Sequence, residues 1–89
     1  MNCRTLLELT THRSDFDPGL TIYAAEPWSP SSLAIVAAES VDGSIPPIAL
    51  HNQCRYFLEV FIVNEVLSGW SGSDLDACHR LIKYAESDA

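Results

Sequence analysis

Two short apolar runs in the first half of the chain predict β-strands. The run from Leu20 to Ala25 alternates larger apolar residues with small or polar ones and contains Thr, Ile and Tyr, which is typical of a half-buried strand. The run from Leu33 to Ala38 is continuously apolar and lies between a Ser/Pro cluster and polar residues. A run this short indicates a buried strand rather than a helix. We expect the two strands to pair antiparallel.

Helical patterns flank these strands. From Thr5 to Thr10 the leucine spacing predicts a brief helix with Asn2 or Thr5 as its N-cap, and the turn residues 17–19 (DPG) lie beyond its end. Near the C-terminus, Ser73 is an N-cap candidate ahead of two aspartates, and an amphipathic helix follows. We expect its buried stripe to consist of Leu75, Cys78, Leu81, Ile82 and Ala85.

The segment from Leu50 to Ser68 is apolar on nearly every side. Its Tyr, Phe, Val and Ile residues favour sheets, but it contains no Gly or Pro and is long for a strand. Gly69 provides a stop signal for a helix. We therefore expect one long buried helix over residues 50–68.

These elements predict a single α+β domain over residues 1–89. Its order would be a short N-terminal helix, two short antiparallel strands, a long buried helix and a C-terminal amphipathic helix. So few elements would leave part of the long helix uncovered, and large uncovered apolar patches mark association surfaces. We therefore expect a homodimer or a complex with another protein.

Composition and charge narrow the class of partner. With 47% hydrophobic and 19% charged residues, the chain has the composition of a globular protein. Twelve acidic residues against five Lys and Arg give a formal charge of −7, which disfavours nucleic acid and favours a basic protein. No apolar run is long enough to span a membrane, and the N-terminus lacks a secretory pattern. We expect a cytoplasmic protein with reduced thiols at Cys3, Cys54 and Cys78.

No motif names a reaction, and we expect no cofactor and no metal site. Two histidines and two cysteines invite a zinc interpretation, but Cys78 and His79 are adjacent on a helix and would point in different directions. A cysteine nucleophile, Cys54 or Cys3, would need a histidine base, and nothing in the sequence positions one. A non-enzymatic role is therefore favoured.

Four residues are candidates for an interface. Glu59 lies within the most apolar segment, where a carboxylate is unusual, although an exposed or hydrogen-bonded Glu59 is the plainer interpretation. Tyr56 belongs to the same segment, and Trp28 and Trp70 stand beside serines at the ends of expected elements. For both tryptophans, packing against the core is the competing interpretation.

One stretch resembles a known group of proteins. Residues 22–23 (IY), 27–29 (PWS), an apolar strand ending in acids and residues 55–61 (RYFLEVF) resemble a family of small, uncharacterised bacterial proteins that share a Y-F-L-E-V-F type helix. The family has no established activity, so the resemblance assigns no catalytic residue. It implies a bacterial accessory protein of the cytosol.

Together these observations predict a protein-association module. It would either self-associate or bind a basic partner, as inhibitor and immunity proteins do. The alternative is a small-molecule binding or hydrolytic domain that uses Glu59 in an apolar aromatic pocket.

Overall fold

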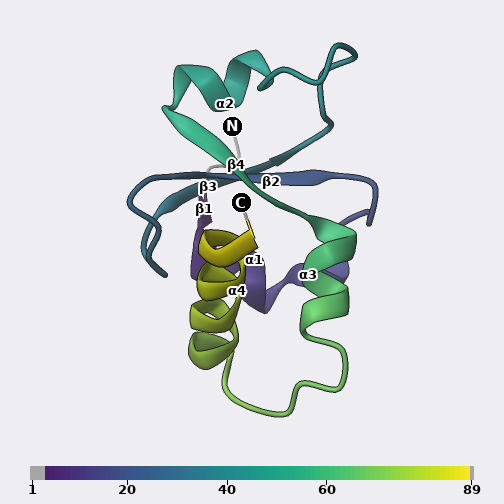
Figure 1. Cartoon of the computed structure of the whole chain (residues 1–89), viewed down its shortest axis with the longest axis vertical. Coiled ribbons are helices and arrows are strands. Elements are labelled where there is room, and N and C mark those ends of the chain that lie inside the picture. Colours follow the sequence, from purple (N-terminus) through teal and green to yellow (C-terminus); the bar gives the residue numbers. More distant parts are fainter. Residues whose placement is uncertain (1–3, 89) are drawn as a thin grey trace.

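A four-stranded antiparallel sheet divides the molecule into two layers (Figure 1). The computed structural model describes residues 4–88, with strand order β1-β3-β2-β4. The elements are β1 (Arg4–Thr5), α1 (Leu6–Thr11), a 3-10 helix (Arg13–Asp15), β2 (Thr21–Ala25), β3 (Leu33–Ala37), α2 (Pro47–His51), β4 (Cys54–Glu59), α3 (Val60–Val66) and α4 (Asp74–Asp88).

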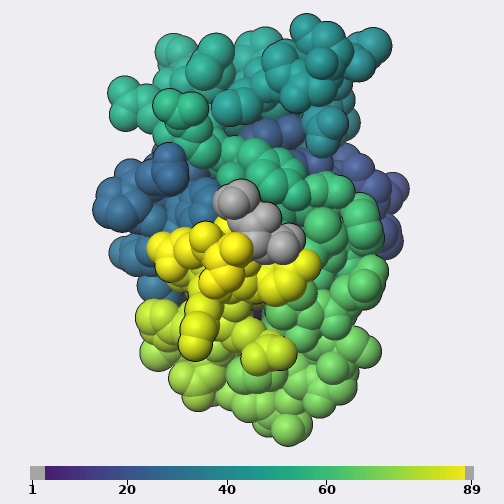
Figure 2. All heavy atoms as spheres, in the orientation of Figure 1, coloured from purple at the N-terminus to yellow at the C-terminus, as the bar shows by residue number. Residues whose placement is uncertain are grey.

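Each face of the sheet has its own core. Helices α1, α3 and α4 cover one face, called here the three-helix face, while α2 and the loop 38–46 cover the other, called the α2 face (Figure 1). Figure 2 shows the same division, with the teal segment that includes α2 at one end of the molecule and the green and yellow helices α3 and α4 at the other. The smaller core, on the α2 face, is formed by Tyr23, Ile35, Ala49 and Cys54.

The structure confirms the α+β class, and β2 and β3 form where two strands were predicted, but the predicted layout of only two strands is wrong because β1 and β4 also belong to the sheet. Thr5 caps α1 in a reciprocal arrangement with Glu8, and the Ser73 hydroxyl accepts a hydrogen bond from the Asp76 N–H at 3.1 Å. The stripe expected on α4 is buried from Cys78 onward, but Leu75 is 47% exposed. Leu75 lies in the first turn of α4, ahead of the buried residues Ala77 and Cys78.

The prediction of one long helix over residues 50–68 is wrong. The segment is divided among the end of α2, strand β4 and helix α3. Gln53 adopts a left-handed conformation with φ of 60° and separates α2 from β4 without any Gly or Pro. Helix α3 then follows β4 with no loop, and Gly69, at φ of 75°, lies in the turn after it.

Backbone groups of another loop stabilise this abrupt junction. The first N–H groups of a helix have no partner within the helix itself. In α3 the N–H of Val60 donates to the Leu20 carbonyl at 2.9 Å, and that of Phe61 donates to the Pro18 carbonyl at 3.2 Å. The segment before β2 therefore fixes the point where strand becomes helix.

Strand β4 contains a β-bulge at Phe57. Ile22 of β2 lies opposite Leu58, and Tyr23 lies opposite Tyr56, so Phe57 has no partner on β2. In a regular strand, Phe57 and Leu58 would point to opposite faces. Because of the bulge, both pack into the core of the three-helix face.

Neighbouring residues at the β4–α3 junction should respond differently to the same substitution. Val60 is fully buried, whereas Phe61 is 45% exposed. Val60→Asp would bury a carboxylate without a partner at a cost of about 4 kcal/mol or more, which removes most of the stability of a small domain. Phe61→Asp should leave the protein folded. Urea unfolding followed by circular dichroism measures both, and equal destabilisation would contradict this junction.

Candidate functional site

Tyr56 and Glu59 of β4 form a hydrogen-bonded pair on the α2 face. Residues three apart in a regular strand point to opposite faces, but the bulge at Phe57 restores both to one face. Tyr56 lies opposite Tyr23 and Glu59 lies opposite Thr21, two residues that share a face of β2. The Tyr56 hydroxyl donates a hydrogen bond to Oε1 of Glu59.

A second carboxylate, that of Glu39, acts electrostatically on Tyr23 and Tyr56. Glu39 follows β3 in the loop 38–46 and is exposed. Its negative charge, together with that of Glu59, raises the pKa values of both Tyr23 and Tyr56. We call the surface made by Glu39, Tyr56 and Glu59 the Tyr56 face.

Burial is the main cause of the raised tyrosine pKa values. The pKa of Tyr56 lies well above its usual 10.0 because of burial, the hydrogen bond to Glu59 and the charges of Glu59 and Glu39. The pKa of Tyr23 is raised by burial and by the same two carboxylates, while a hydrogen bond with Thr21 opposes the change. Both phenols therefore keep their protons at neutral pH.

This arrangement suits recognition of a cation. The Tyr56 side chain is 41% exposed, so its ring is accessible while its hydroxyl is held by Glu59. An ammonium or guanidinium group is attracted to an aromatic face and to carboxylates beside it.

The other two interface candidates lie elsewhere. Trp28 packs on the three-helix face, with its ring edge-on to Phe57 at 5.0 Å and its indole N–H donating to the Ala24 carbonyl at 3.2 Å. Trp70 donates to the Ser73 carbonyl at 3.2 Å and lies 6.0 Å from the Arg80 guanidinium. The structure thus brings together two of the four candidates, Tyr56 and Glu59.

The hydrolytic alternative places Glu59 in an apolar pocket. Glu59 does not line the cavity beside Val66, the one beside Phe16 or the one beside Cys54. Within residues 4–88 no three His, Cys, Asp or Glu side chains are grouped to hold a metal ion. Likewise, no helix formed by these residues has both the length and the apolar character needed to cross a membrane.

Both described cysteines are buried. Cys54 begins β4 and packs in the core of the α2 face. Cys78 belongs to the other core, where burial raises the pKa of its thiol despite a hydrogen bond with Thr10. Cys3 lies outside the described residues. A raised pKa disfavours the nucleophilic thiolate at Cys78.

Sequence reasoning missed Glu39 as a site residue. Its only signal was its place just after an apolar strand, which many solvated carboxylates share. Its approach to Tyr56 depends on how the loop 38–46 folds over the α2 face, and residue spacing does not reveal that.

Comparisons with protein-family models, curated proteins and solved structures found no match for this chain. The resemblance to the bacterial family therefore remains a prediction. The interpretation of the site rests on its geometry and charge.

The raised tyrosine pKa values predict that the folded protein is less stable at high pH. Above about pH 10 the unfolded state loses the Tyr56 proton while the folded state keeps it, so the free energy of unfolding falls as pH rises. In the Tyr56→Phe variant the free energy of unfolding should decrease less steeply with pH. The decrease that remains should come from Tyr23. Urea unfolding between neutral and strongly alkaline pH measures it. An unchanged slope in the variant would contradict the assigned environment of Tyr56.

Proposed function

We propose that this protein is a non-enzymatic association module that binds a basic protein partner through the Tyr56 face. The observation that carries the proposal is the exposed Tyr56 ring, held by Glu59 and flanked by the charge of Glu39. A lysine or arginine side chain of the partner would lie against the ring and contact both carboxylates. A cytosolic location accompanies the proposal.

The overall charge supports the same class of partner. A chain with a formal charge of −7 attracts a basic protein over distances longer than any contact, which raises the association rate at low salt. The Tyr56 face would then select the geometry of the complex. Its hydrogen bond fixes the positions of the Tyr56 ring and the Glu59 carboxylate before binding, so less side-chain freedom is lost in the complex.

Self-association through the Tyr56 face is disfavoured. A twofold contact places a surface against its own copy, so Glu39 and Glu59 would approach the same carboxylates of the second chain. Like charges brought together at an interface cost several kcal/mol.

Another surface favours a homodimer as the second candidate function. Strand β4 ends the strand order of the sheet, and Leu50 and Phe61 on either side of it are 64% and 45% exposed. An outer strand can pair with its copy across a twofold axis. The bulge at Phe57 works against such pairing, because bulges interrupt the ladder at sheet edges.

A short oligolysine peptide is a suitable probe for the Tyr56 face. We expect Glu59→Gln to weaken binding about tenfold, the equivalent of ~1.4 kcal/mol, because one charge-assisted contact is lost. Glu86→Gln removes the same charge from an exposed position on α4 and serves as the matched control. Titration calorimetry at low salt gives both dissociation constants. Equal weakening by the two variants would show attraction to net charge alone and would contradict a specific site.

Solution mass separates the two candidate functions. The basic-partner proposal predicts the 9.8 kDa monomer at all concentrations, since like-charged chains repel. Light scattering behind a sizing column measures the mass. A stable dimer that Phe61→Asp dissociates, while Glu59→Gln leaves it intact, would instead support association near the β4 edge.

A further inference from the structure

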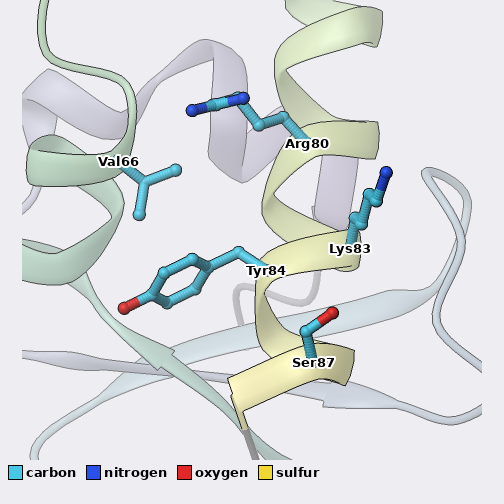
Figure 3. Close-up of a pocket in the computed structure, with 5 residues that line it drawn as sticks. All are labelled: Val66, Arg80, Lys83, Tyr84 and Ser87. Atoms are coloured by element: carbon cyan, nitrogen blue, oxygen red, sulfur yellow. The ribbon is translucent and has the colours of Figure 1, made fainter.

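An open groove between α3 and α4 gathers two of the five cationic residues of the chain. Its volume is about 300 Å³, and its lining consists of Val66, Arg80, Lys83, Tyr84 and Ser87 (Figure 3). Four of these residues come from consecutive turns of α4, at spacings that place them on one side of the helix. The groove lies in the three-helix layer, whereas the Tyr56 face lies across the sheet.

The two cations of the groove form no ion pair among the described residues. Arg80 lies over the Trp70 ring at 6.0 Å, a contact that leaves its charge without a carboxylate. By contrast, Arg13 approaches Asp74 at 3.9 Å, and Arg55 lines a different cavity together with Glu26. In a chain with more than twice as many acidic as cationic side chains, two unpaired cations in one groove form a local site of opposite charge.

The groove also offers apolar walls. Figure 3 shows Arg80 and Tyr84 extending from α4 toward Val66 of α3, while Lys83 extends from the same helix away from Val66. In this view the Val66 side chain lies between the Arg80 guanidinium and the Tyr84 ring. Lys83 adds charge from a flexible stem whose ammonium group can turn toward a bound anion.

We propose that this groove binds a small organic anion, with a carboxylate or phosphate group on Arg80 and an apolar body between Val66 and Tyr84. The planar guanidinium fork matches either oxyanion with two parallel hydrogen bonds. A volume of about 300 Å³ is at the small end of ligand sites, so it fits a single substituted ring better than a nucleotide. This inference is independent of the proposed function, because no residue of the Tyr56 face takes part.

Amide NMR titration of the intact protein tests the proposal with four probes. Phenyl phosphate and benzoate carry the two acid groups on a ring, inorganic phosphate lacks the ring, and benzyl alcohol lacks the charge. We expect saturable shifts centred on Val66 and residues 80–87 with at least one aromatic anion, and weaker binding of the other two probes. The tighter of the two aromatic anions identifies the preferred acid group.

Matched variants locate the site. Arg80→Gln should raise the dissociation constant of the aromatic anion about tenfold, because a charge-assisted contact is lost. Lys83→Gln should raise it less. Arg55→Gln removes the same charge from another exposed position and should change it less than about twofold. The proposal is overturned by absent saturable shifts, by equal binding of benzyl alcohol, or by an equal effect of Arg55→Gln.

Discussion

The structure depends on one extra residue in its outer strand. Phe57 has no partner on β2, and this bulge decides which way the side chains on either side of it point. Phe57 and Leu58 enter the same core, while Tyr56 and Glu59 meet on the opposite face and form their hydrogen bond. A regular strand would have placed the two residues of each pair on opposite faces of the sheet. The core of the three-helix face and the candidate site therefore share one cause.

The division of residues 50–68 into strand and helix also changes the reason to expect a partner protein. An undivided helix over residues 50–68 would have needed cover on all sides, which was the reason to expect a partner. As strand followed by helix, the same residues find cover within one chain, with Leu58, Val60 and Val63 all buried. These buried residues therefore need no second chain to cover them. A smaller set of apolar side chains remains exposed. Charge is also unevenly distributed, with carboxylates on the α2 face and the cationic side chains of Arg80 and Lys83 between α3 and α4.

Short sequence patterns predicted the parts of the fold that depend on neighbouring residues alone. The caps at Thr5 and Ser73, the turn at Gly69 and the strands beside Tyr23 and Ile35 follow from short patterns. The break at Gln53 did not, because a non-glycine residue in a left-handed conformation leaves no compositional signal. The helix start at Val60 depends on carbonyls of Pro18 and Leu20, about forty residues away, and so does the placement of Glu59. Of the candidate site, the sequence indicated Tyr56 and Glu59 but neither their contact nor Glu39.

Backbone nuclear Overhauser effects between β2 and β4 test the bulge at Phe57, because they report the register of the two strands. We expect contacts between Ile22 and Leu58 and between Tyr23 and Tyr56, with Phe57 opposite no residue of β2. Within residues 54–66, helical contacts should begin only at Val60. Helical contacts running without interruption through residues 54–66, or a regular register in which Phe57 faces Tyr23, would contradict this bulge. A regular register would place Tyr56 and Glu59 on opposite faces of the sheet, and an uninterrupted helix would remove the strand on which the Tyr56 face is built.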